Sequence, residues 1–181
     1  MAEKVDCLDD FYKLLHPRPV FLIAAIDDKG KPNIMSCAWA TPVSEEPKLI
    51  CIALWKKGYT NELIRKTKEF TINVTTEDLI KVVKLAGSKS GRVYDKIKLT
   101  KVRLEKSKLL KTPMIKDCVA NLGCKLVNYY ECGECWILIG EVVEAKVDKQ
   151  FFKKVFNVER AKILLHLGDE YFTIPEKLIE A

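Results

Sequence analysis

Apolar and polar residues are arranged along the chain in short runs that predict a mainly β protein. Each run is rich in Val, Ile, Leu and aromatic residues and is bounded by turn residues such as those at 27–31, which is typical of strands. In residues 70–74 the apolar positions alternate with polar ones, whereas residues 20–26 are apolar or small throughout, as in a buried strand. Six strands are predicted in this way, over 20–26, from about 32, and over 48–55, 70–74, 119–130 and 136–147.

The remaining segments predict short helices and one polar loop. Helical spacing covers residues 8–15, 60–67, 77–85 and about 150–155, and Thr60 or Asn61 is able to cap the second of these helices. Residues 86–92 form a polar loop, and short apolar runs return at 163–167 and 171–172. Strands so close in sequence favour one α+β or mainly β domain over 1–181, built as a closed or partly closed barrel with peripheral helices.

Composition narrows the class of protein. The 181 residues are 48% hydrophobic and 31% charged, which is typical of a soluble globular chain. No signal-peptide pattern or membrane-spanning apolar window is found, so we expect a cytoplasmic protein with no membrane partner. The net charge of +6 is spread over the sequence without a basic stripe of exposed aromatic residues, so we expect no nucleic-acid partner. Seven cysteines without a secretion signal are expected to be free thiols.

Two loops beside the third predicted strand, at 36–41 and 56–60, combine hydroxyl groups, Trp and Lys. Loops at the same end of neighbouring strands can converge on one ligand, and this mixture suits a flat aromatic ligand with an anionic tail. Thr60 opens a predicted helix, where free backbone amides and the helix dipole favour a phosphate, and Lys56 and Lys57 add positive charge. The alternative is that Thr60 only caps its helix and that Trp39 fills the core.

Three further features have structural alternatives. The loop at 88–92 offers two hydroxyls, two cations and a glycine, but its order is not that of a Walker A loop, and a solvated loop is the alternative. Cys132 and Cys135 form a C-x-x-C motif. Three interpretations are open: a hairpin turn with free thiols, a redox pair, or a metal site together with Cys118 and Cys124. The spacing of the second pair is wrong for structural zinc, and we expect no metal. His16 and His166 are the only histidines, and no hydrolase triad accompanies them.

In their order along the chain, several segments together resemble the flavin reductase-like, FMN-binding split-barrel family, particularly its flavoredoxin-like members. The resemblance covers most of the chain, although each fragment alone is weak. The segments that carry it are 18–20, 30–36, 39–44, Pro47, 59–64, 67–74 and 139–142.

This resemblance implies a fold and a set of cofactor contacts. The fold would be a six-stranded Greek-key split barrel with peripheral helices, acting as a homodimer with FMN near the subunit interface. The isoalloxazine would lie against Met35, Ser36, Cys37, Trp39, Ala40 and Thr41, and the ribityl chain beside Ala53, Leu54, Trp55 and Lys56. The phosphate would be bound by Tyr59 and Thr60 and covered by Ser88, Lys89, Ser90 and Arg92.

The resemblance also implies the chemistry. His166 matches a C-terminal histidine that faces the flavin, and Cys135 stands where many members of the family carry a histidine, so both are candidate catalytic residues. We expect an FMN-dependent oxidoreductase that takes electrons from transiently bound NAD(P)H and reduces flavin, ferric iron or a redox protein partner. The alternatives are a non-catalytic flavin-binding protein or electron carrier and, as a third reading, a cysteine-based metal or redox module.

Overall fold

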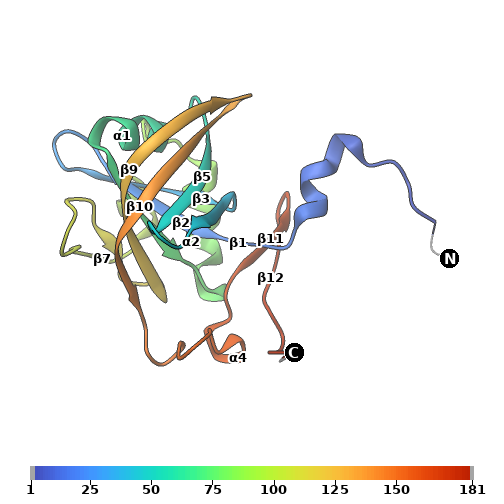
Figure 1. Ribbon diagram of the computed structural model, residues 1–181. Coiled ribbons are helices and arrows are strands. Elements are labelled where there is room, and N and C mark those ends of the chain that lie inside the picture. The colour runs from blue at the N-terminus through green and yellow to red at the C-terminus, as the bar shows by residue number, and fades with distance from the viewer. Residues whose placement is uncertain (1–2, 180–181) are drawn as a thin grey trace.

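A seven-stranded antiparallel sheet dominates the computed structural model, which describes residues 3–179 (Figure 1). Its strand order is β3-β2-β6-β9-β10-β5-β4. The strands are β2 (Phe21–Ile26), β3 (Pro32–Cys37), β4 (Ala40–Ser44), β5 (Leu49–Trp55), β6 (Glu69–Val74), β9 (Ala120–Cys132) and β10 (Cys135–Val147).

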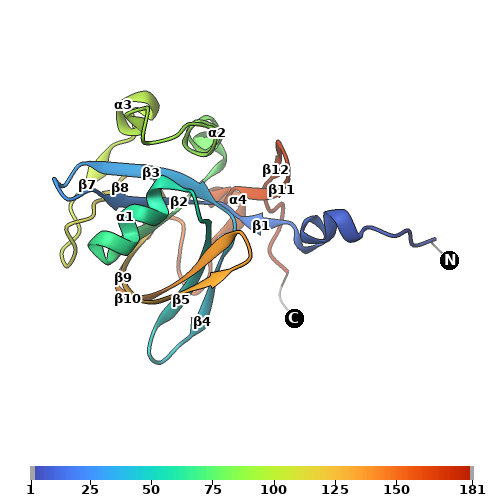
Figure 2. The ribbon, with the colours of Figure 1, turned by 90° about the horizontal axis from the view of Figure 1, so that it is seen from above.

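The six predicted strands are neighbours in this sheet, and β4 adds a seventh at its edge. The sequence predicts a loop at residues 36–41, but only residues 38 and 39 lie outside strands, because β4 pairs with β5 from Ala40 onward. The sheet curls so that β4 and β5 lie across from β2 and β3, and the β4–β5 hairpin projects from the body (Figure 2).

Two apolar clusters lie on the two faces of β2, which explains its uninterrupted apolar sequence. Inside the curl, Ile23 and Ala25 pack with Ile52, Phe70 and Leu138. The opposite face packs under a helix and the segment before β9; its buried members include Leu22, Ala24, Ile34, Val83, Ala86, Ile115 and Leu164.

The helices are short and lie outside the sheet. Helix α1 (Tyr59–Thr67) follows β5 and contacts β2, β3 and β6. A 3-10 turn, η2 (Glu77–Leu79), leads into α2 (Ile80–Ser88), which continues three residues beyond the predicted end and packs on β3. The two remaining helices and the N-terminal 3-10 helix are α3 (Lys96–Thr100), α4 (Val158–Ala161) and η1 (Leu8–Leu15).

The predicted helix over about 150–155 is wrong. This segment forms turns in which Phe152 and Phe156 make an isolated bridge with ring centroids 5.1 Å apart. The helix begins later, at Val158, because the Asn157 side chain accepts a hydrogen bond from the backbone N–H of Arg160 and so caps the first turn.

A second sheet joins the two ends of the chain. Strand β1 (Arg18–Pro19) pairs with β11 (Leu165–Gly168), which forms a hairpin with β12 (Tyr171–Thr173). The N-terminal segment runs away from the barrel beyond this sheet (Figure 1). A short pair of strands, β7 (Leu104–Glu105) with β8 (Met114–Ile115), lies in the connection to β9. Within residues 3–179, no helix is long and apolar enough to cross a membrane.

Candidate functional site

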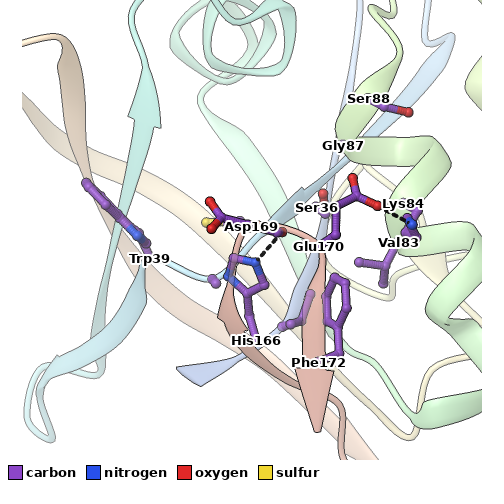
Figure 3. Close-up of a pocket in the computed structure, with 13 residues that line it drawn as sticks. Ser36, Trp39, Val83, Lys84, Gly87, Ser88, His166, Asp169, Glu170 and Phe172 are labelled. Carbon is purple, nitrogen blue, oxygen red and sulfur yellow. Dashed lines mark hydrogen bonds and ion pairs between the residues drawn. The ribbon is translucent and has the colours of Figure 1, made fainter. Parts of the chain in front are cut away.

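A cleft of about 490 Å³ lies between the end of β3, helix α2 and the β11–β12 hairpin (Figure 3). Its volume falls within the range of small-molecule sites, about 300–1,000 Å³. Its lining residues come from distant parts of the chain: Val20, Ser36, Cys37, Ala38, Trp39, Val83, Lys84, Gly87, Ser88, His166, Asp169, Glu170 and Phe172. Five of the predicted site residues meet here, namely Ser36, Cys37, Trp39, Ser88 and His166.

Gly87 allows α2 to lie directly against β3. A Cβ atom built on Gly87 would stand 2.4 Å from the Oγ of Ser36, which is far inside van der Waals contact. Any larger residue would therefore have to move either the helix or the Ser36 side chain. The width of the cleft at this point depends on the absence of a side chain.

The cleft combines apolar walls with hydroxyl groups. Val20, Val83 and Phe172 supply apolar surface, and Lys84 forms an ion pair with Glu170 between α2 and the hairpin (Figure 3). In the part of the chain that the structure describes, the hydroxyl groups of Ser36 and Ser88 make no hydrogen bond to protein. They therefore remain available to a bound molecule. Such apolar surface with a few placed polar groups is typical of sites for aromatic cofactors.

His166 points into the cleft between Trp39 and Phe172 (Figure 3). Its Nε2 lies 3.1 Å from the backbone oxygen of Asp169, and its ring centroid lies 5.1 Å from that of Phe172. Because a carbonyl oxygen only accepts, this hydrogen bond requires a proton on Nε2. In the neutral ring, Nδ1 then carries the free lone pair.

The turn that carries Asp169 is held by the N-terminal segment. The Nζ of Lys13 lies 2.9 Å from a carboxylate oxygen of Asp169 and 2.9 Å from one of Asp10, and these hydrogen bonds raise the pKa of the Lys13 amine. Both Gly168 and Asp169 have positive φ, at 117° and 50°, so the turn is tight. This contact fixes the carbonyl that His166 uses.

Cys37 lines the cleft but is 7% exposed. Burial raises the pKa of its thiol to about 12, and the neighbouring thiols of Cys51 and Cys135 add to the effect. The group therefore stays a protonated thiol near neutral pH and acts as apolar wall rather than as a nucleophile.

A second cleft of about 380 Å³ lies at the other end of β3 and contains two more predicted residues, Tyr59 and Arg92. The Arg92 guanidinium stacks over the Tyr59 ring at 5.0 Å and pairs with Glu62 at 2.7 Å. Thr60 is 2% exposed, and its Oγ1 accepts a hydrogen bond of 2.8 Å from the side-chain amide of Asn33. Its hydroxyl is thus engaged within the protein.

The other predicted residues lie outside both clefts. Leu54 is buried in the barrel, Trp55 is 54% exposed at the end of β5, and Lys56 pairs with Glu131 on the next hairpin. Cys135 begins β10. The rest lie on or beside β3, β4, β5 and the loop after α2: Met35, Ala40, Thr41, Ala53, Lys89 and Ser90.

Several residues of the main cleft were not predicted from the sequence, including Val83, Lys84, Glu170 and Phe172. The pattern did indicate a helix at 77–85 and apolar runs at the C-terminus. Nothing in the pattern indicated that these two segments would lie side by side over β3. The close approach of Gly87 to Ser36 could not be predicted either, because a glycine in a polar stretch indicates a loop rather than a helix.

Three comparisons place the chain among known proteins. The model of the family described as flavin reductase like domain matches residues 13–175. An uncharacterized protein of Archaeoglobus fulgidus is 34% identical over 142 residues, covering 78% of this chain and 77% of that protein. A flavin reductase of Pseudomonas putida is 29% identical over 140 residues, covering 75% of this chain and 76% of that enzyme.

A solved structure shows the same fold. Flavoredoxin from Methanosarcina acetivorans superposes with a TM-score of 0.88 at 28% identity, covering 99% of this chain and 95% of that one. This likeness confirms the predicted split barrel.

Proposed function

The chain belongs to the flavin reductase-like domain family, and we propose that it binds FMN in the cleft between β3, α2 and the β11–β12 hairpin. We further propose that it is an oxidoreductase in which NAD(P)H reduces the flavin. The electrons then pass to free flavin, ferric iron or a redox protein. The observation that carries this proposal is the meeting of Ser36, Trp39, Ser88 and His166 around one cleft.

The residues of the cleft fit a flavin. Trp39 and Phe172 offer flat surface to an isoalloxazine ring. Among residues 3–179, the hydroxyls of Ser36 and Ser88 have no hydrogen-bond partner that a flavin would have to displace. A Cβ at Gly87 would stand 2.4 Å from the Ser36 Oγ, so the glycine keeps a side chain off the hydroxyl that a flavin would use. When bound, FMN supplies hydride and electron transfer, while the protein supplies orientation and electrostatics.

His166 is the candidate proton-handling residue. Its Nε2 proton is held on the Asp169 carbonyl, so Nδ1 is the atom that can take or deliver a proton in the cleft. Phe172 and His16 flank its ring and fix its orientation. Cys135 does not line the cleft, so His166 is the better supported of the two candidate catalytic residues.

We also propose a homodimer in which the partner covers the open side of the cleft. Trp39 lines the cleft and is 40% exposed, and Val43 on the same edge of the sheet is 51% exposed. Strand β4 is an edge strand with unpaired backbone groups, which favours pairing with another chain. A second copy docked here would shield both the edge and the flavin.

The direct test is FMN titration followed by anaerobic mixing with NADH and with NADPH. We expect FMN to bind with a visible spectral change and the flavin to bleach rapidly with at least one nucleotide. A protein that takes up no FMN contradicts the proposal. Binding without bleaching by either nucleotide would instead identify a carrier reduced by another protein.

A variant that fills the cleft locates the site. Ser88→Trp places a large ring at the exposed end of α2, where it lines the cleft, and should weaken FMN binding at least tenfold. Lys81→Trp is the matched control, because Lys81 is exposed on the same helix away from the cleft. Equal affinities of the two variants would place the flavin elsewhere.

A further inference from the structure

We propose that Cys132 and Cys135 are a reversible dithiol–disulfide couple at the tip of the β9–β10 hairpin, which exchanges with low-molecular-weight disulfides. This activity is separate from the proposed flavin chemistry and does not depend on it. Neither cysteine is part of a disulfide in the structure.

The register of the hairpin places the two residues opposite each other. Cys132 and Cys135 are Cα partners in the β9–β10 ladder, with only Gly133 and Glu134 between them. Directly opposed residues in antiparallel strands have Cα atoms about 4.5–5.5 Å apart, which lies inside the range of about 4.4–6.8 Å that a disulfide spans. The Cα separation expected from the register therefore lies within reach of a disulfide at the tip of the hairpin.

The turn between them is built for this close approach. Gly133 has φ +53°, as expected for the first central residue of a type II′ turn, and no atom lies within 4 Å of the position of its missing Cβ. The tip is thus open to solvent. A disulfide around two intervening residues closes only a small loop, so it adds little stability and the fold does not depend on it.

Exposure and strand pairing together separate this pair from the other five cysteines. Cys132 is exposed and Cys135 half-buried, whereas Cys37, Cys118 and Cys124 are buried. Cys7 and Cys51 are half-buried, and neither faces a cysteine across a strand pair. Across residues 3–179, no other two cysteines are ladder partners.

A metal site is the obvious competitor for a C-x-x-C motif. Structural zinc needs four ligands, usually two such pairs. Among the described residues, no group of three or more His, Cys, Asp or Glu is placed to hold a metal ion. Two thiols without further ligands favour thiol–disulfide chemistry.

The surroundings assign a role to each thiol. Partial burial and the Glu134 carboxylate raise the pKa of the Cys135 thiol, while Lys56 opposes them. The backbone N–H of Lys56 donates to the Glu134 carbonyl at 2.9 Å, which pins the turn to the end of β5. Exposed Cys132 is therefore the residue that attacks first, and Cys135 is the resolving thiol.

The exchange needs only the protein dithiol and one small disulfide, because atoms and electrons balance between them. The Cys132 thiolate attacks one sulfur of a small disulfide, RSSR, which forms a mixed disulfide and releases one RS⁻. The Cys135 thiolate then attacks the Cys132 sulfur, which closes the protein disulfide and releases the second RS⁻. The two protons from the cysteines appear on two RSH molecules, so the protein dithiol is oxidised as RSSR is reduced.

The test is a redox titration of the full chain in glutathione and glutathione disulfide, with alkylation and mass analysis. We expect two of the seven thiols to disappear together and to return with dithiothreitol, and peptide mapping to link Cys132 with Cys135. Cys135→Ser should instead accumulate a glutathione adduct on Cys132. Cys7→Ser, as the control, should retain the two-thiol loss.

Two results would overturn the proposal. One is a wild-type protein that keeps all seven thiols at oxidising ratios of glutathione disulfide to glutathione. The other is a wild-type protein that stops at a stable adduct on Cys132, as the Cys135→Ser variant does. Both results can be read from the wild-type chain, so they do not require that any variant fold.

Discussion

The rings of His16 and His166 lie edge to face with their centroids 5.1 Å apart, although 150 positions separate them in sequence. The pairing of β1 with β11 brings them together, since Arg18 is the register partner of His166. The Nε2 of His16 is buried without a partner among the described residues, and its Nδ1 lies 3.3 Å from the carbonyl oxygen of Lys13. His16 thus supports the ring that faces the cleft.

Replacing the two histidines should separate proton handling from positioning. We expect His166→Phe to lower the rate of flavin reduction by NAD(P)H by about 100-fold, which is typical of the loss of a general acid or base. The Kd for FMN should change much less, because the phenyl ring keeps the packing against Phe172. Anaerobic stopped-flow kinetics and FMN titration measure the two quantities.

His16→Phe is the matched control for this prediction. It retains an aromatic ring behind His166 and should reduce the rate less than tenfold. If both variants lose activity equally, His166 is a positioning residue. If neither variant loses activity, proton transfer does not pass through the histidine pair.

The contact of Gly87 with Ser36 predicts a non-additive pair of substitutions. Gly87→Ala alone should lower the free energy of unfolding by about 1–3 kcal/mol, because the new Cβ would stand 2.4 Å from the Ser36 Oγ. In a Ser36→Ala background that oxygen is gone and the nearest remaining atom, the Ser36 Cβ, is 3.7 Å away. In that background Gly87→Ala should be neutral or stabilising, since Ala favours a helix by about 1 kcal/mol over Gly. Urea unfolding of the four proteins tests this, and additive effects would contradict the close contact.

The sequence predicted the strands well because strand formation depends on local pattern. All six predicted strands are present, and the turn after residue 26 occurs where its residues indicate. The connection expected at 131–135 is shorter, because β9 and β10 extend to Cys132 and Cys135 and leave a two-residue turn. The alternation in residues 70–74 does not mark a solvent-facing side. Thr71 and Asn73 are fully buried, because the segment around β8 covers the face on which they lie.

The site was less predictable because it depends on contacts between distant segments. Ser36, Trp39, Ser88 and His166 were singled out from composition and resemblance, and they do meet. The residues that close the cleft, Lys84 and Glu170, pair across 86 positions, and no local pattern encodes such a pairing. Thr60 shows the same difference. Its place at the start of a helix could be predicted from local sequence, but its hydrogen bond to the distant Asn33 could not.

Asn73 should be essential to the stability of the barrel. Its side-chain amide donates to the Leu22 carbonyl at 2.8 Å, and its oxygen accepts from the Ile115 N–H at 2.9 Å and from Asn121 at 2.8 Å. Asn73→Ala leaves these buried groups unpartnered, so we expect a loss of about 3 kcal/mol or more in the free energy of unfolding. Asn128→Ala, at an exposed position on β9, should change it by less than about 0.5 kcal/mol. Similar losses in urea unfolding would contradict the role of this network.

Lys96 predicts how stability depends on pH. Its amine is buried and donates to the Ala86 carbonyl at 2.6 Å, and burial lowers the pKa of Lys96 to about 8 from its usual 10.5. Between these two values the unfolded chain binds the proton and the folded chain does not, so stability rises with pH from about 8 to 10.5. Below pH 8 the penalty is constant. Lys96→Met should remove this rise, which is on the order of 1–3 kcal/mol. Urea unfolding at pH 7, 8, 9 and 10 measures the free energy of unfolding of both proteins. If that free energy depends on pH in the same way in the wild type and in Lys96→Met, the lowered pKa of Lys96 is contradicted.

Val43 tests the proposed dimer and its link to the flavin. It lies on edge strand β4, in the irregular stretch between Pro42 and Ser44, and half of its surface is exposed. The β4–β5 hairpin that carries it projects from the barrel (Figure 2), where the proposed partner would cover it. Val43→Glu would bury an unpaired charge in that interface, and we expect a monomer by sedimentation velocity. The control is Val93→Glu, on the exposed loop after α2. Thr41→Glu is unsuitable as a control because Thr41 belongs to the predicted flavin site.

Dimer formation and FMN binding should depend on each other. If the partner covers the cleft beside Trp39, the monomeric Val43→Glu variant should bind FMN at least tenfold more weakly, although Val43 does not line the cleft. Dilution of the wild-type protein should release FMN over the same concentration range in which the dimer dissociates. A monomeric variant with wild-type affinity would show that one chain holds the flavin alone. A variant that stays dimeric would move the interface away from β4.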